Sequence, residues 1–182
     1  MMNRRFSDWV KWNDRNGLVG NDLPGVYAIA RCDKDISGSS FEWHQDIIYV
    51  GMTNSKGGLK SRLQQFENTI AGEQGHGGAL RVINKYPDYQ SLVPLLYVSV
   101  LPVNCNVSSN LPTDLRTMGD VAKLEYECFA QFFELFGKLP EFNDKQRSPK
   151  KKNTNEKSWS GKIGKLYKWV ICSIRRSRRQ SI

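Results

Sequence analysis

The stretch Ile47-Ile48-Tyr49-Val50-Gly51 decides how this chain folds, because it joins β-branched and aromatic residues and ends on a glycine. A short apolar run of this kind is typical of a buried β-strand. A second such run, residues 26–31, lies upstream and follows the turn residues Leu23-Pro24-Gly25. The polar connection between them, residues 32–45, is longer than common hairpin loops. The sequence therefore predicts an antiparallel hairpin with a long excursion.

Helical periodicity replaces the strand pattern from residue 57 onward. Leu59, Leu63, Phe66 and Ile70 form one apolar stripe, and Arg62 lies at its edge, about 60° from Leu59. Residues 71–78 are rich in glycine and are predicted to be a loop that carries His76. A short helix over 80–86, a third strand over 93–101 and a polar, turn-rich segment over 104–117 follow. Residues 1–20 are interpreted as an amphipathic opening segment, with four candidate core residues: Phe6, Trp9, Val10 and Trp12.

A helix predicted over residues 120–136 carries an acid where an apolar residue is expected. Its apolar face comprises Val121, Leu124, Cys128, Phe132, Leu135 and Phe136. Glu125 falls on the same face, about 40° from Val121, whereas Glu127 points about 160° away from Glu125. A buried carboxylate without a partner costs several kcal/mol or shifts its pKa. We therefore expect an arginine or a metal ion to meet Glu125; a structural Glu–Arg pair or a different helix register are equally weighted alternatives.

Charge is concentrated at the C-terminal end of the chain. The protein has 182 residues and a net charge of +9, but residues 147–182 hold 12 Lys and Arg against one acid, Glu156, a net +11 that leaves −2 for residues 1–146. A localised cationic stretch is typical of proteins that bind nucleic acid through phosphates. A solubilising tail is the alternative, and a membrane-surface segment around residues 166–171 is a third, less favoured one.

The remaining composition narrows the class of protein. The hydrophobic fraction of 39% is enough for a core, and no apolar run approaches the length of a membrane span or a secretory signal. Four scattered cysteines show no paired-ligand spacing, so we expect free thiols, a cytoplasmic setting and no structural zinc.

Together these residues resemble the GIY-YIG endonuclease superfamily. Gly25-Val26-Tyr27 and Tyr49-Val50-Gly51 are similar to its two signature tripeptides, followed in order by Arg62, Glu125 and Pro140-Glu141-Phe142-Asn143. The resemblance covers residues 23–146. It implies a small α/β (α+β) domain, with a three-stranded antiparallel sheet flanked by helices. We expect a helical segment over 1–22 before this domain and a basic tail over 147–182 after it. The loop between the signature strands, and the interval from Glu125 to Pro140, are longer than is usual in the family.

The resemblance also implies a reaction, the hydrolysis of DNA phosphodiester bonds with Mg²⁺ or Mn²⁺. Glu125 alone would bind the metal, which is sufficient because Mg²⁺ typically takes one or two carboxylates and keeps several waters. Arg62 would hold the phosphate, and Tyr27 and Tyr49 would position water, with Tyr27 favoured as general base. His76 is an evenly weighted fifth catalytic candidate, and His44 in the long loop a much weaker one.

DNA is thus the expected partner, and no small-molecule substrate is expected. Candidate DNA contacts are Lys60, Lys150, Lys151, Lys152, Arg175, Arg176, Arg178 and Arg179. The rival hypothesis is a nucleic-acid-binding protein that has the same fold but no catalytic activity. The presence of both tyrosines, Arg62 and Glu125 argues against it. Sequence specificity and oligomeric state stay open.

Overall fold

The computed structural model describes residues 5–73 and 75–150. These residues belong to one compact unit, and residues 151–182 lie outside the described residues. The elements in chain order are β1 (Val10–Lys11), the 3₁₀ helix η1 (Trp12–Gly17), β2 (Gly25–Arg31), β3 (Ile47–Thr53), α1 (Gly58–Ile70), α2 (Gly77–Lys85), α3 (Tyr89–Leu92), the 3₁₀ helix η2 (Val93–Leu95), β4 (Leu96–Pro102) and α4 (Pro112–Phe136).

The strands form one antiparallel sheet in the order β1-β4-β2-β3. The expected mixed α/β class with an antiparallel sheet is confirmed, as is the hairpin of β2 and β3, in which Tyr27 pairs with Gly51. The expectation of three strands is wrong by one, because Val10 and Lys11 pair with the outer side of β4.

The N-terminal segment is not the α-helix that we expected. It runs through a two-residue strand into a six-residue 3₁₀ helix. Trp9 packs into the cluster on one side of the sheet and Trp12 into the cluster on the other, and both side chains are buried. An α-helix would place residues three apart on nearly the same face, so only a segment that crosses the sheet edge can bury both indoles.

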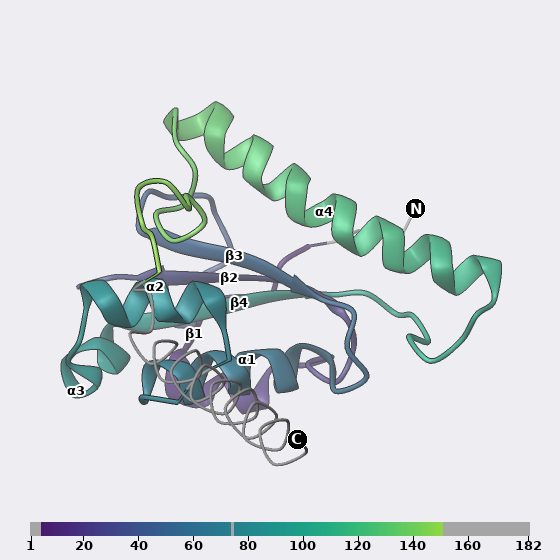
Figure 1. Ribbon diagram of the computed structural model, residues 1–182, viewed down its shortest axis with the longest axis horizontal. Helices are drawn as coiled ribbons and strands as arrows, with labels where there is room; N and C mark the ends of the chain where they lie inside the picture. The colour runs from purple at the N-terminus through teal and green to yellow at the C-terminus, as the bar shows by residue number, and fades with distance from the viewer. Residues whose placement is uncertain (1–4, 74, 151–182) are drawn as a thin grey trace, which may run out of the picture. The chain divides into compact units, whose positions relative to one another are not determined.

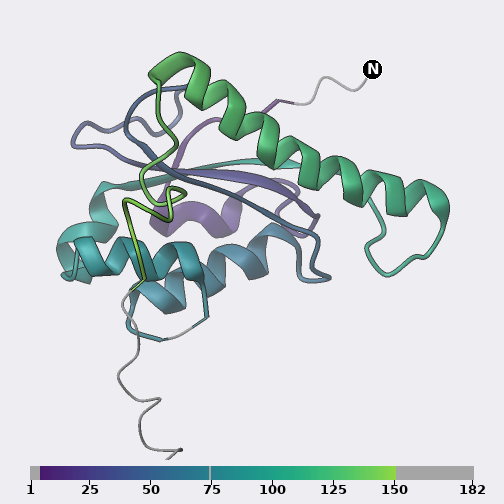
Figure 2. The same cartoon turned by 45° about the horizontal axis from the view of Figure 1, so that its top comes forward.

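Helices cover both faces of the sheet (Figure 1). One face packs against α4, while α1 and α2 lie on the opposite side, and Figure 2 shows the same layering after a 45° turn. Val26, Ala28 and Ala30 belong to the cluster that includes Cys128 and Phe132 of α4. Tyr27 and Ile29 belong to the other cluster, with Leu59, Leu63, Phe66 and Ala79. From Val26 to Ala30, β2 is therefore apolar at every position, rather than at alternate ones.

The helix between β3 and the glycine-rich segment matches its prediction, and its neighbour begins earlier than predicted. Leu59, Leu63, Phe66 and Ile70 are all buried in α1. The predicted loop over 71–78 ends sooner, because α2 starts at Gly77. The His76 side chain caps this helix by accepting hydrogen bonds from the amides of Gly78 and Ala79.

The last helix is also longer than predicted. α4 starts at Pro112, where a proline fits the first turn because it lacks only an amide that has no helical partner there. It ends at Phe136, and the capping residue Gly137 has a φ of 68°, the left-handed conformation that glycine adopts readily. Val121, Cys128 and Phe132 are buried as expected, but Leu135 is 56% exposed, so its assignment to the buried face is wrong.

The segment after α4 covers the outer edge of β3. Phe142 donates its amide to the Ile48 carbonyl at 2.9 Å. The Asn143 side chain accepts from the Val50 amide at 2.8 Å and donates to the Val50 carbonyl at 2.7 Å. These bonds satisfy an edge strand that would otherwise be free to pair with another chain. Among the described residues no helix is both long and apolar enough to cross a membrane.

Candidate active site

The two signature tyrosines lie on adjacent strands of the same sheet face. Tyr27 is fully buried in β2 and Tyr49 is 9% exposed in β3, with their ring centroids 6.0 Å apart. Gly51 makes this approach possible, because a Cβ there would lie 2.6 Å from the Tyr27 hydroxyl and 2.8 Å from the Tyr49 ring. The glycine of the second tripeptide thus leaves room for both phenols.

His76 completes a cluster with the two tyrosines. Its Nε2 lies 2.8 Å from the Tyr27 hydroxyl, and its ring contacts those of Tyr49 and Phe66. Since Nδ1 accepts two backbone N–H groups at 3.1 and 3.2 Å, the ring proton must reside on Nε2, which donates to Tyr27. Burial, followed by the charge of Arg62, lowers the pKa of His76 to about 3. The imidazole is therefore neutral and has a fixed tautomer.

Arg62 reaches this cluster from α1. Burial first, and then the neighbouring Tyr49, raise the pKa of Tyr27 well above its usual value, while Arg62 opposes that rise. The pKa of Tyr49 is also raised, chiefly by burial, and Arg62 again acts against it. Arg62 donates to Gln65 through Nη1 at 3.0 Å, whereas its buried Nε has no hydrogen-bond partner. A guanidinium with an unused donor beside two phenols is suited to binding an anion.

Glu125 approaches from the opposite layer, past the edge strand β3. It is half-buried, and the Met52 amide lies within hydrogen-bonding reach of its carboxylate. Burial raises the pKa of Glu125, whereas Met52, Arg62 and Lys145 act in the opposite direction. Among residues 5–73 and 75–150, no cationic side chain forms an ion pair with Glu125. The Glu125 carboxylate lies near the tyrosines, since its charge raises the pKa of Tyr49. No direct ion pair with a described residue neutralises it.

The structural Glu–Arg pair considered for Glu125 occurs instead at Glu67. This carboxylate accepts hydrogen bonds from the Trp12 indole and the Tyr89 hydroxyl, and Arg15 Nη2 lies 3.7 Å from its Oε2. Glu67 and Arg15 are almost entirely buried, with side chains 14% and 10% exposed. Two partly buried glutamates therefore differ in kind: Glu67 is saturated with partners and Glu125 is not.

Two residues of this region, Gly78 and Arg81, escaped the sequence analysis, which named Asn143 only as part of the element Pro140-Glu141-Phe142-Asn143. Gly78 packs so closely on Tyr49 that a Cβ would lie 2.3 Å from its ring. Arg81 donates to the Gly77 carbonyl at 3.0 Å, has a buried Nε without a partner, and acts electrostatically on both Tyr49 and His76. Asn143 fixes the backbone of Val50, next to Tyr49. The sequence signal that could have identified Arg81 is its spacing from His76. That spacing becomes informative only when the first residue of α2 is known.

The candidate DNA contacts fall into three groups. Lys150 lies against Gly77 at the start of α2, where a Cβ would be 2.6 Å from its Nζ, and its charge acts on His76. Lys60 is exposed on α1, about 160° around the helix from Arg62, so it does not join the cluster. The other candidates, Lys151, Lys152, Arg175, Arg176, Arg178 and Arg179, lie outside the described residues.

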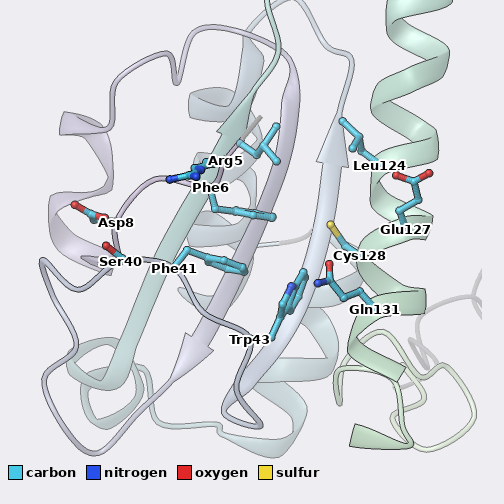
Figure 3. Close-up of a pocket in the computed structure, with 11 residues that line it drawn as sticks. Arg5, Phe6, Asp8, Ser40, Phe41, Trp43, Leu124, Glu127, Cys128 and Gln131 are labelled. Carbon is cyan, nitrogen blue, oxygen red and sulfur yellow. The ribbon is translucent and has the colours of Figure 1, made fainter. Parts of the chain in front are cut away.

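A separate hollow of about 560 Å³ lies between the N-terminal segment, the long loop and α4 (Figure 3). It is lined by Phe6, Phe41 and Trp43 on one side and by Glu127, Cys128 and Gln131 on the other. Tyr27, Tyr49, Arg62 and His76 do not line it. Glu127 therefore lines this hollow and also pairs with Lys123 at 3.3 Å, whereas Glu125 lies near the tyrosines.

Comparison with known proteins identifies no relative of this chain. No protein-family model, no curated protein and no solved structure matches the chain.

Proposed function

We propose that this protein is a metal-dependent DNA endonuclease of the GIY-YIG type. The observation that carries the proposal is the convergence of Tyr27, Tyr49, His76, Arg62 and Glu125 from four elements and one helix cap. Stability of the fold does not require these groups to lie together. They are two phenols, a neutral imidazole, an arginine with an unused donor and a carboxylate without an ion-pair partner among the described residues. Together they provide the groups that phosphodiester hydrolysis requires.

Glu125 fits the role of metal ligand. Its side chain is half-buried and forms no direct ion pair with any described residue. Its carboxylate oxygens are therefore free to coordinate a cation. A bound Mg²⁺ or Mn²⁺ would polarise a phosphoryl oxygen and lower the pKa of a coordinated water.

His76 supports proton transfer by donating a hydrogen bond rather than by taking a proton. Its Nδ1 is occupied by two amides, and its pKa of about 3 excludes a stable imidazolium near neutral pH. The Nε2–H group and the Arg62 charge both favour negative charge on the Tyr27 oxygen. Tyr27 must first release its own phenol proton to solvent. The tyrosinate then takes a proton from the attacking water as that water bonds to phosphorus and the bond to the leaving oxygen breaks, and the leaving oxygen is protonated by solvent.

The cations around the cluster supply phosphate binding. Arg62 and Arg81 each retain a buried Nε without a partner, and Lys150 lies at the start of α2 beside them. The amides at the start of α2 are not available for this purpose, because His76 caps Gly78 and Ala79. We infer that the scissile phosphate is bound by side chains, and chiefly by Arg62.

The competing function is nucleic-acid binding without cleavage on the same fold. The basic residues support it as well as they support a nuclease. It offers no use for Glu125, since binding a polyanion is opposed by a nearby uncompensated carboxylate. Glu125 therefore favours the nuclease.

Plasmid nicking by the full chain in Mg²⁺ or Mn²⁺, compared with EDTA, tests the proposal. We expect Glu125→Gln and Arg62→Ala each to reduce the cleavage rate by at least about 100-fold while DNA affinity changes far less for Glu125→Gln. Glu127→Gln is the matched control and should cleave at the wild-type rate. Absence of metal-dependent cleavage, or equal loss in Glu127→Gln, contradicts the assignment.

A further inference from the structure

A second group of ligand atoms lies at the base of the long connection between β2 and β3. It consists of Cys32, which directly follows β2, Asp46, which directly precedes β3, and His44 in the loop. The Cys32 sulfur, one His44 ring nitrogen and one Asp46 oxygen all lie within 4.8 Å of one another. Three types of metal ligand, a thiol, an imidazole and a carboxylate, thus lie close together.

The polar atoms of His44 are not otherwise satisfied. Its Nε2 is buried and has no hydrogen-bond partner, and its Nδ1 lies 3.8 Å from the Asp46 carboxylate, which is too long for a hydrogen bond. Buried polar atoms without partners are uncommon because each costs about 1–3 kcal/mol. A cation between the imidazole and the carboxylate would bind Nδ1, the nitrogen that faces Asp46 in this ring orientation, and would shorten the contact.

The surroundings leave room for a cation. The three residues line a cleft of about 730 Å³ that also contains two acids, Asp33 and Glu42, and two basic residues, Arg31 and Lys34. Cys32 is 5% exposed, whereas the side chains of His44 and Asp46 are 29% and 66% exposed, so the sulfur is enclosed and the ion can enter from solvent. Thiol, imidazole and carboxylate are the ligand types that zinc binds at about 2.0–2.3 Å. Tetrahedral bonds of that length separate the ligand atoms by about 3.2–3.6 Å, so small side-chain movements complete the site.

We propose that Cys32, His44 and Asp46 bind a zinc ion that fastens both ends of the 32–46 connection to the sheet. The three protein ligands leave one tetrahedral position for water or for a further carboxylate of the cleft. The expectation of no structural zinc rested on the absence of paired cysteines. A site with a single cysteine has no such spacing, and its ligands meet only because β2 and β3 are adjacent. This site is separate from Glu125 and does not depend on the proposed nuclease activity.

Cobalt titration of the full-length protein, after removal of metals by EDTA, tests the proposal directly. Co²⁺ bound to a thiolate gives a charge-transfer band in the near ultraviolet, whereas Co²⁺ bound only to a carboxylate does not. We expect the band to saturate at one Co²⁺ per chain and to disappear when one equivalent of Zn²⁺ displaces the cobalt. Cys32→Ser should abolish the band, and His44→Ala and Asp46→Asn should each weaken Co²⁺ binding by at least about 10-fold.

Matched variants separate this site from other thiols and from the nuclease. Cys128→Ser removes a different buried thiol and should retain the band, as should Glu125→Gln. Asp46→Asn changes an exposed side chain, so its loss of affinity cannot be attributed to unfolding. Zinc at a hundredfold excess over its Kd should raise the Tm of the wild type by about 5 °C and that of Asp46→Asn by less. A band that survives in Cys32→Ser, or no thiolate band in the wild type, overturns the proposal.

Discussion

The two glutamates, Glu67 and Glu125, should respond in opposite ways to the same substitution. Glu67→Gln replaces a carboxylate that accepts from Trp12 and Tyr89 with an amide whose NH₂ group faces a donor, and it leaves the buried Arg15 without its counter-charge. Losing one charged hydrogen bond and exposing the cation to an apolar surround should lower the free energy of unfolding by about 2–4 kcal/mol. For a unit of this size the Tm should fall by about 5–15 °C.

Glu125→Gln should cost little stability, since the Met52 amide, which acts on the Glu125 carboxylate, can donate equally to an amide oxygen at that position. Because burial raises the pKa of Glu125, the folded protein binds more protons than the unfolded chain just above the pKa of an unfolded glutamate, about 4.3. Wild-type stability therefore falls as the pH rises through that window, and Glu125→Gln removes this contribution. In the absence of divalent ions, the free energy of unfolding of the variant should therefore rise relative to that of the wild type as the pH goes from acidic to neutral.

Thermal melts followed by circular dichroism in EDTA, at several pH values, measure both effects. The interpretation of Glu125 as a functional carboxylate is refuted if Glu125→Gln melts as far below the wild type as Glu67→Gln does. The structural role of Glu67 is refuted if its variant melts within about 2 °C of the wild type.

Three further predictions concern the geometry around the tyrosines. The ¹⁵N spectrum of His76 should show the proton on Nε2 and no titration above about pH 4, and a proton on Nδ1 would contradict the capping arrangement. Gly51→Ala should fold with a loss of about 1–3 kcal/mol and should lose cleavage, because its Cβ would displace the Tyr27 hydroxyl, whereas Gly119→Ala, which meets nothing within 4 Å, should retain cleavage. Asn143→Ala should lower unfolding free energy by about 2 kcal/mol in urea titrations, through the loss of both bonds to Val50; an unchanged midpoint would show that water replaces the side chain.

The sequence predicted the parts of the fold that local pattern determines. The stripe of Leu59, Leu63, Phe66 and Ile70 and the apolar strands around Tyr27 and Tyr49 carry their periodicity in neighbouring residues, and both were located correctly. The fourth strand was not predictable in this way, because Val10 and Lys11 become a strand only by pairing with β4, far along the chain. Two buried tryptophans on opposite sides of the sheet likewise imitate an amphipathic helix in a one-dimensional pattern.

Burial of the site was harder to predict than its members. Periodicity placed Glu125 on the apolar face of its helix, and it is half-buried there. Periodicity could not indicate that α4 passes the edge of β3, where the Met52 amide points outward to meet that carboxylate. His76 gave no signal in the residue pattern, since it stands among glycines, and only the family resemblance made it a candidate. Its role as a helix cap follows from the start of α2. Arg81 became visible only with the start of that helix.

The site is arranged so that its buried acids and its imidazole favour their neutral forms. Burial raises the pKa values of Tyr27, Tyr49 and Glu125 and lowers that of His76. Each shift disfavours charge, yet Arg62, Arg81 and Lys150 place cationic side chains around the same point. The protein alone therefore presents cations without enough anions to balance them. A DNA phosphate would supply the missing negative charge, and a divalent ion would let Glu125 ionise beside it. Charge balance thus favours assembly of the ionised site only when nucleic acid and metal bind together, so metal affinity should be higher with DNA bound than without it.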